Sequence, residues 1–290
     1  MTTDSRRLSP LILLCLAATW LIWGSTYLAI RFTLHGFAPF FGMGTRFILA
    51  GVLVMGWMRW RRAPWPTGRQ WRNAVVIGGL LLVSGMGATA YAEQTVPSGL
   101  VVTFVAVMPA LISLFNLALG IRPGRLQITG MIVGFLGVLL LMRGAAFTAS
   151  PVGLAAISIA TLSWSLGSVL SQRRFPLAAG AMGYGSEMLV GGLMLLAVSA
   201  LFREPRNWPV DALAVGSWLY LVVAGSLLAF NAYMYLLGHA SAALASSYAF
   251  VNPVIALLLG IWLGHETVTG REWLAAGVIL AGVVLLLRGR

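Results

Sequence analysis

Two charged residues lie deep inside apolar stretches of the chain. Arg46 ends the motif Gly42-Met-Gly-Thr-Arg46, and Glu187 ends the similar motif Gly183-Tyr-Gly-Ser-Glu187 at an offset of 141 residues. A charge at the centre of a bilayer costs at least about 2.5 kcal/mol, so it must face protein, water or a partner. Their chemistry fits substrate orientation, gating or proton exchange at Glu187. The alternative is that each is a structural anchor.

A second candidate group consists of uncharged polar and aromatic residues that recur at helical spacing. Trp20, Trp23 and Tyr27 fall at i, i+3 and i+7, which places them on one helix face. Rings and hydrogen-bonding groups on one face suit a cavity for small amphipathic solutes. The predicted substrate-binding residues are Trp20, Trp23, Tyr91, Trp164, Ser168, Asn231, Tyr235, Tyr248 and Asn252. The alternative is interhelical hydrogen bonding or interface anchoring, which we favour for Tyr27 and Gln94.

Two prolines are predicted to kink their helices. Pro109 and Pro253 each lie about twelve residues into an apolar stretch, near the expected midplane. A proline in a helix interior frees the carbonyl four residues earlier, here that of Val105 and that of Ala249. Such kinks would widen the centre of the bundle, or they would only bend the helices for packing.

The elements that hold these residues are too apolar for a soluble protein. Of the 290 residues, 59% are hydrophobic and 9% are charged, with a mean hydropathy of +0.91, whereas soluble domains carry about 25% charged residues. About 20 apolar residues cross a bilayer as a helix. Ten such segments are predicted, near 9–30, 38–58, 73–92, 97–119, 125–142, 151–171, 180–201, 211–236, 241–263 and 271–288. The first is too long for a signal-peptide core, so we expect a retained helix.

The charge distribution predicts an orientation. All nineteen basic residues are Arg, and the formal net charge is +12. With both termini cytoplasmic, thirteen arginines lie inside and five outside, while Arg46 lies within a span, which satisfies the positive-inside rule. No basic stripe with interleaved aromatic residues remains outside the spans, so nucleic-acid binding is excluded.

The sequence lacks the patterns of enzymes and metal sites. His35, His239 and His265 show no metal-ligand spacing, and the single Cys15 provides no disulfide framework. There is no His-Glu-x-x-His motif, no paired membrane Asp and no P-loop. We therefore predict no catalytic residue, no metal, no cofactor and no ATP-driven pump.

An internal repeat divides the chain into residues 8–144 and 151–289. The sequence from Phe135 to Gly144 resembles that from Leu280 to Gly289 at an offset of 145, and Pro109 corresponds to Pro253 at 144. Each half has five predicted spans, so the second half is inverted relative to the first. Inverted repeats are a recurring architecture of secondary transporters, whose substrate site lies near the midplane between the repeats.

An ordered set of loose motifs carries a family resemblance over about residues 8–289. It comprises Trp23-Gly24-Ser25, Arg46-Phe47, Pro253, Gly264-His265-Glu266, Gly277 and Ala281-Gly282-Val283. With these the chain resembles the drug/metabolite transporter superfamily, specifically its EamA-type ten-helix members, which include amino-acid and metabolite exporters of the YddG kind. The resemblance implies a central cavity lined by spans one, three, four, six, eight and nine. Arg122 is a departure, because the first repeat often carries an acidic residue there.

The predicted fold class is therefore an all-α integral membrane protein with ten transmembrane helices in two inverted five-helix repeats. The predicted function is a secondary transporter or facilitator, and more specifically an exporter of small metabolites such as amino acids. The alternative is a channel, a receptor or an intramembrane enzyme. The expected partners are the lipid bilayer of a cell inner membrane, a small-molecule substrate and, through small-residue faces such as Gly130, Gly134 and Gly137, a second copy of the chain.

Overall fold

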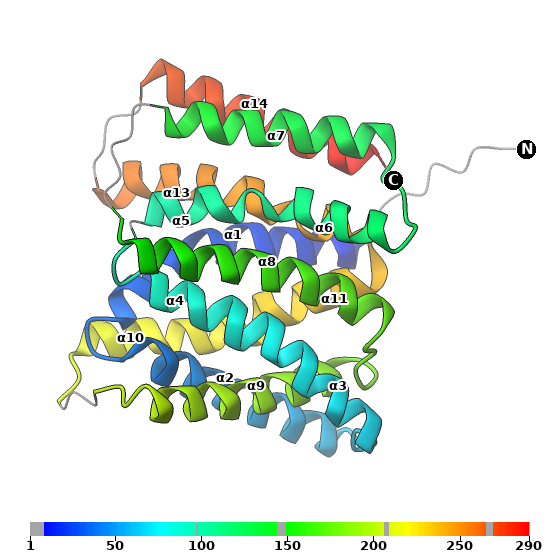
Figure 1. The fold of residues 1–290 in the computed structure, drawn as a ribbon, viewed down its shortest axis with the longest axis vertical. Helices are drawn as coiled ribbons and strands as arrows, with labels where there is room; N and C mark the ends of the chain where they lie inside the picture. Colours follow the sequence, from blue (N-terminus) through cyan, green and yellow to red (C-terminus); the bar gives the residue numbers. More distant parts are fainter. Residues whose placement is uncertain (1–8, 97, 144–148, 206–208, 265–268, 290) are drawn as a thin grey trace, which may run out of the picture.

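The computed structural model is helical throughout the residues it describes, which are 9–96, 98–143, 149–205, 209–264 and 269–289. Its helices lie side by side in layers stacked along the long axis of the molecule (Figure 1). Within these residues, seven helices are long and apolar enough to span a membrane: Pro10–Thr33, Pro39–Trp60, Gly68–Ala92, Pro151–Arg173, Ala181–Leu201, Ala212–His239 and Gly270–Arg288. Shorter apolar helical segments lie between these spans and are described below as α5, α6, α7, α12 and α13. A helical multi-span protein is thus confirmed, and the count of ten spans stays a prediction.

Short capping motifs end one span and start the next. α1 (Pro10–Thr33) begins after Ser9, whose hydroxyl accepts a hydrogen bond from the Ile12 amide, and α8 (Pro151–Arg173) begins after Ser150 in the same way. Proline suits the first helical position because the amide hydrogen it lacks would have no partner there. α2 (Pro39–Trp60) also begins on a proline, and α9 (Ala181–Leu201) follows Gly180, whose φ is +60°. These caps allow the chain to reverse direction over few residues.

Two long spans contain a π-helical segment in the middle. The first consists of α3 (Gly68–Gly78), η1 (Gly79–Gly87) and α4 (Ala88–Ala92). The second consists of α10 (Ala212–Tyr220), η2 (Leu221–Phe230) and α11 (Asn231–His239). The two π-helical segments start 142 residues apart, which is close to the offset of the sequence repeat. π-helical turns are rare and occur frequently at functional sites.

The segment predicted as a single helix over 97–119 is broken. α5 (Ser98–Val105) ends before α6 (Met108–Ala118) begins, and Pro109 lies in the first turn of α6. The span is therefore interrupted directly before Pro109, and whether the proline causes this break stays a prediction. In the other half, α12 (Ala242–Ala245) precedes α13 (Tyr248–Gly264), which contains Pro253 in its interior.

Glycines hold two pairs of helices in close contact. In α7 (Arg125–Met142) and α14 (Gly270–Arg288), an added Cβ at Gly130 would lie 2.8 Å from the Gly282 oxygen, and one at Gly137 would lie 2.8 Å from the Ile279 amide nitrogen. In α2 and α9, a Cβ at Gly51 would lie 2.6 Å from the Leu189 nitrogen. The glycine face that led us to predict a homodimer is therefore occupied within the chain, by α14 and by Phe250 of α13 next to Gly134.

Arginines gather at one end of the molecule. This arginine-rich end holds the start of α1, the connections α2–α3, α6–α7 and α8–α9, and the end of α14 (Figure 1). Its described arginines are Arg59, Arg61, Arg62, Arg69, Arg72, Arg122, Arg125, Arg173, Arg174 and Arg288. The opposite end holds Arg31, Arg143, Arg203 and Arg271 together with Glu93, Glu204, Asp211 and Glu272. The two ends thus differ strongly in charge, and His265 and Glu266 lie outside the described residues.

Candidate functional site

Four aromatic rings meet at the centre of the bundle and form what we call the aromatic cluster, Trp23, Trp164, Tyr233 and Tyr248. The ring of Trp23 on α1 lies 5.6 Å from Trp164 on α8, 5.0 Å from Tyr233 on α11 and 4.6 Å from Tyr248 on α13, between centroids. All four side chains are buried. Edge-to-face pairs of this kind add about 0.5–1.5 kcal/mol beyond the area that they bury. The cluster joins one helix of the first half to three helices of the second.

Hydrogen bonds fix the orientation of the cluster. The Tyr233 hydroxyl lies 2.6 Å from the Ser168 hydroxyl and accepts a hydrogen bond from the Trp164 indole nitrogen at 3.2 Å. The Trp23 indole donates to the carbonyl of Gly225 in η2 at 3.4 Å. Buried tyrosine and tryptophan usually find such partners, because an unpaired polar group is costly away from water. A solute that enters the centre would have to displace or replace these bonds.

A small inner cavity lies directly beside the aromatic cluster. Its volume is about 40 Å³, which leaves room for only about three water molecules. The lining comes from α1, η1, α4, α5, α6, α8 and α13, and it includes Trp23, Tyr27, Thr89, Met108, Trp164 and Tyr248. Tyr27, for which we favoured an interface role, is therefore part of the cavity wall. Among the spans implied by the family resemblance, only the eighth is absent from this lining.

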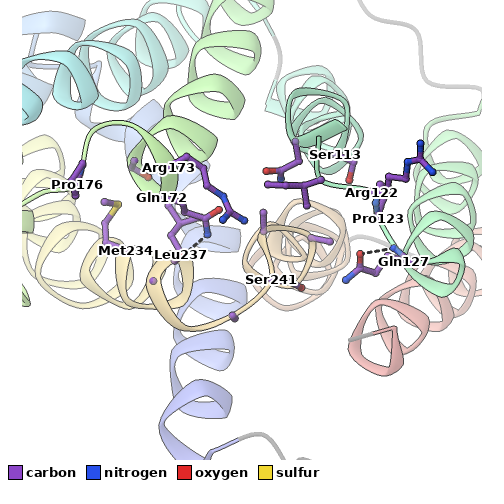
Figure 2. A pocket seen from close by; sticks show the side chains of 18 of the residues that line it. Ser113, Arg122, Pro123, Gln127, Gln172, Arg173, Pro176, Met234, Leu237 and Ser241 are labelled. Atoms are coloured by element: carbon purple, nitrogen blue, oxygen red, sulfur yellow. Dashed lines mark hydrogen bonds between the residues drawn. The ribbon is translucent and has the colours of Figure 1, made fainter. Parts of the chain in front are cut away.

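A much larger cavity, which we call the vestibule, opens at the arginine-rich end (Figure 2). Its volume of about 710 Å³ is within the range of about 300–1,000 Å³ for small-molecule sites. One wall comes from the end of α8 and from α11, where Gln172 donates to the Leu237 carbonyl. The other wall comes from α6 and the start of α7, with Ser113, Arg122 and Gln127. Figure 2 shows these two walls facing each other across α12 and the residues before it.

The vestibule and the inner cavity are stacked along the same helices. On α8, Trp164 lines the inner cavity and Ser171 lines the vestibule, and seven residues of α-helix rise about 10.5 Å. Ser168, which bonds to Tyr233, lies between them. On α6, Met108 lines the inner cavity and Ser113 the vestibule. The aromatic cluster and the Ser168–Tyr233 pair therefore separate a wide chamber from a narrow one.

The end opposite the vestibule is held together by contacts between distant segments. The Glu204 carboxylate accepts hydrogen bonds from the Phe40 and Phe41 amides at 3.0 and 2.8 Å, and so caps the start of α2. The Phe40 ring stacks between Tyr91 and Phe202, with centroids 5.8 and 5.7 Å away. Acidic groups stabilise helix N-termini because they meet the positive end of the helix dipole. Tyr91, predicted to bind substrate, stacks on Phe40 here and lines neither the vestibule nor the inner cavity.

Two hydroxyl pairs also join distant segments on this side of the molecule. Ser25 and Tyr220 lie 2.6 Å apart between α1 and α10, and Thr95 and Ser150 lie 2.7 Å apart between the residues after α4 and the start of α8. Each pair joins a residue of the first half of the sequence to one of the second half. Together with the Glu204 cap, these contacts connect distant segments of the chain on the side away from the vestibule.

The remaining predicted lining residues lie around these cavities without lining either. The Trp20 indole donates to Ser247 at 2.9 Å, and Tyr235 stacks on His239 with centroids 3.9 Å apart. The Asn231 amide donates to the Ser226 and Leu227 carbonyls of η2, at 3.1 and 3.0 Å. The Trp20 bond is of the interhelical kind that the alternative predicts, whereas the Tyr235 and Asn231 contacts lie within their own span, so substrate binding by these three residues stays a prediction.

Asn252 has a more direct link to the inner cavity. Its amide donates to the hydroxyl of Tyr27, at 3.5 Å, and its own carbonyl oxygen is buried without a partner among the described residues. Tyr27 lines the inner cavity. Asn252 therefore supports the cavity wall from behind.

Both embedded charges are fully buried. Arg46 donates to the Ser226 hydroxyl at 2.7 Å and lies 4.8 Å from the centroid of the Phe47 ring. One guanidinium nitrogen of Arg46 and both carboxylate oxygens of Glu187 have no hydrogen-bond partner among the described residues. Uncompensated buried charges are strongly unfavourable. Neither residue lines the vestibule or the inner cavity, so any part that they play in transport requires a change in the packing around α2 and α9.

Tyr233 is a central residue that the sequence pattern missed. We predicted its neighbours Asn231 and Tyr235, which share one face of a regular helix, and Tyr233 lies on the other face. The π-helical segment η2 ends at Phe230, directly before these residues. The inserted wide turns rotate the following helix, and this rotation brings Tyr233 into the aromatic cluster. The ring and hydroxyl of Tyr233 were visible in the sequence, but its direction was not.

Comparison with known proteins identifies the fold. A model described as the EamA-like transporter family matches residues 9–143 and again residues 151–288. The chain belongs to the EamA-like transporter family. The resemblance inferred from the sequence motifs is thereby confirmed, and the EamA chain is a multi-pass membrane transporter with a small-molecule substrate.

Relatives and a solved structure agree with this assignment. The chain is 40% identical over 289 residues to the uncharacterized inner membrane transporter YedA of Escherichia coli strain K12, covering 98% of this chain and 93% of that protein. It is 28% identical to the protein PecM of Dickeya dadantii, covering 91% and 88% of the two chains. A solved crystal structure, 22% identical, aligns with a TM-score of 0.77 over 96% of this chain and 97% of that chain. At that identity the structural match shows the fold alone.

Proposed function

We propose that this EamA protein is a secondary transporter that exports small metabolites such as amino acids by alternating access. The observation that supports the proposal is the arrangement of the two cavities, wide at one end and narrow beside the aromatic cluster, with hydrogen bonds between distant segments on the opposite side. A channel would need a continuous path, whereas the aromatic cluster interrupts this one. The sequence repeat, with inverted halves of residues 8–144 and 151–289, supports an exchange between two such states.

In this mechanism the solute enters the vestibule and reaches the aromatic cluster. The rings of Trp23, Trp164 and Tyr248 offer apolar walls, and the hydroxyls of Ser168 and Tyr233 offer a few placed hydrogen bonds. Such a mixture favours small amphipathic solutes. Binding would separate the Ser168–Tyr233 pair, after which the hydroxyl pairs and the Glu204 cap at the far end open.

The paired helices α2–α9 and α7–α14 act as rigid bodies in this scheme. Their glycines let the helix backbones pack closely, because an added Cβ would lie 2.5 Å from the Gly134 nitrogen at Gly282 and 2.6 Å from the Leu189 nitrogen at Gly51. The breaks before α6 and before α13 lie in spans that line the cavities. Movement is therefore expected at the breaks, with the glycine-packed pairs as supports.

With both termini on the cytoplasmic side, the open vestibule faces the cytoplasm and the structure represents the state that loads a substrate for export. Single-cysteine labelling tests this orientation. In a Cys15→Ser background, an impermeant reagent applied to intact cells should label Pro205→Cys and should not label Thr67→Cys. Labelling at position 67 with protection at 205 would show the opposite orientation, and the direction of transport would have to be reversed.

Uptake by proteoliposomes that contain the purified protein tests the substrate class. A panel of labelled amino acids and other small metabolites should include members that enter faster than into empty liposomes, and amphipathic members should rank first. If no panel member enters above the rate of empty liposomes, the proposed function is wrong.

A further inference from the structure

The vestibule carries positive charge that no acidic side chain offsets. Arg122 and Arg173 are among its lining residues, and this lining includes neither Asp nor Glu. Among the described residues, the whole arginine-rich end contains no acidic side chain beside its arginines. A concave surface lined by charge of one sign raises the local concentration of ions of the other sign. The vestibule is therefore electrostatically suited to anions.

Arg173 is the residue placed to bind such an anion. It is the last residue of α8, its side chain is exposed, and Figure 2 shows its guanidinium in the gap between the two walls. Arg122 lines the opposite wall, and its guanidinium points away from the gap. Arginine binds carboxylates through two parallel N–H donors, which gives strength and a defined direction.

Polar groups without charge complete the site. Asn116 on α6 lines the vestibule, and its side-chain oxygen is buried without a hydrogen-bond partner among the described residues. A buried carbonyl oxygen without a donor is costly, and a ligand hydroxyl or amine would satisfy it. Ser113 lies one turn earlier on the same helix, also in the lining. The vestibule thus offers donors for an anion at Arg173 and an acceptor at Asn116.

We propose that the vestibule is a substrate-selection site for organic acids that carry a hydrogen-bond donor. Arg173 binds the carboxylate of the acid, and the side-chain oxygen of Asn116 accepts a hydrogen bond from the donor group of the same molecule. The proposal rests on the proposed transport function and adds to it the chemical class that enters the vestibule first. Neutral analogues of the same shape would lack the charged contact and enter less often.

Matched acid and amide probes test the proposal on the purified full chain. Lactate and lactamide, and mandelate and mandelamide, differ in charge and hardly in shape. Ligands that bind the folded state raise the thermal unfolding midpoint. The acids should raise it more than the amides, and the difference should shrink in 1 M salt, where the screening length is about 3 Å.

Two neighbouring arginines provide the variant and its control. Arg173 lines the vestibule, whereas Arg174 is exposed and is absent from its lining. Arg173→Gln should weaken acid binding by about three- to tenfold, the range for a charged hydrogen bond at an exposed site, and Arg174→Gln should keep the parent affinity. Asn116→Leu should reduce the affinity for lactate and leave that for propionate, which lacks the hydroxyl, unchanged.

Several results would overturn the proposal. These are equal shifts with acid and amide, no shift with any acid, or an acid preference that survives Arg173→Gln. The same measurement in nanodiscs with and without phosphatidylglycerol separates a soluble acid from a lipid headgroup. A shift that depends on Arg173 and appears with the anionic lipid alone would assign the site to lipid. Proteoliposome uptake that continues without acid preference would leave transport standing and remove only the vestibule site.

Discussion

At the scale of single residues, the aromatic cluster is the part of the molecule on which the transport proposal depends. Trp164 contacts Trp23 and Tyr233 and lines the inner cavity, so in the proposed mechanism it would both interrupt the path and bind the solute. Trp164→Ala and Asn252→Ala should weaken transport and change the ranking of substrates, by about two- to tenfold for each ring contact or hydrogen bond lost. Trp65→Ala, at an exposed loop position, should do neither.

Because removing a large buried ring also destabilises the fold, Trp164→Phe is the more informative variant. It keeps an aromatic ring and removes the indole N–H that reaches the Tyr233 hydroxyl. Uptake rates normalised to the amount of folded protein would decide the question. An unchanged substrate ranking in all three cavity variants would remove the aromatic cluster from the binding site.

Substitution of Glu187 tests whether this residue couples transport to protons or only stabilises the structure. Glu187→Gln keeps the shape of the side chain and removes the group that can exchange a proton, so transport should lose part of its pH dependence between pH 5 and 8. Glu272→Gln, at the exposed start of α14, should behave like the parent. Parent-like transport in both variants across this range would leave Glu187 without a coupling role, and loss of folding in Glu187→Gln would favour the structural anchor.

The burial of Glu93 predicts how the stability of the folded protein changes with pH. It follows α4, and burial raises the pKa of its carboxyl well above the ordinary value, although Arg31 acts in the opposite direction. A raised folded-state pKa of an acid means that stability is greatest below the unfolded-state pKa and falls as pH rises toward the folded-state pKa. Glu93→Gln should therefore raise the thermal midpoint at pH 8 and change it little at pH 4. A midpoint that is lowered at pH 8 would show that the charged form is stabilised.

Most residues around the aromatic cluster could be predicted from the sequence, but one could not. Trp23, Trp164, Ser168 and Tyr248 were chosen from their type and spacing, and the fold brings them together. Tyr233 was not chosen, because its direction depends on the π-helical turns before it. Hydropathy carries no information on such turns, since η1 and η2 are mostly apolar, as regular spans are.

At the scale of elements, the caps and the apolar stretches predicted most helices within a few residues. α1, α2, α8 and α9 lie close to the predicted segments. The break between α5 and α6 was not predicted: Pro109 indicated a kink in the stretch over 97–119, but hydropathy does not show that the helix stops there. The sequence also did not predict that α7 pairs with α14. Glycines indicate a close helix contact, but they do not indicate which helix is the partner.

The glycine contacts predict opposite effects at two positions of α14. Gly282→Ala would place a Cβ 2.5 Å from the Gly134 nitrogen, whereas no atom lies within 4 Å of an added Cβ at Gly277. Gly282→Ala should therefore cost about 1–3 kcal/mol through overpacking, and Gly277→Ala should be neutral or stabilising, by up to about 1 kcal/mol of helix propensity. Thermal unfolding in detergent measures both. Equal effects at the two positions would contradict the close packing of α7 against α14.

At the scale of the whole molecule, the end that is rich in arginine is also the end that contains the larger cavity. The arginine-rich end contains the vestibule, and the opposite end contains the Glu204 cap and the hydroxyl pairs. Composition alone predicted a membrane protein, and the Arg distribution predicted its orientation. The state of the two ends could not be predicted, because it depends on how the helices pack against one another, which hydropathy and charge do not specify.

The most direct test of alternating access is solute counterflow. Proteoliposomes are loaded with a high concentration of an unlabelled substrate found in the uptake panel and diluted into a trace of the labelled form. A carrier exchanges the two, so label should accumulate inside transiently above its external concentration and then decline, and Trp164→Phe should change the height of this overshoot. Label that rises to the external concentration without an overshoot would show a channel and would contradict the account.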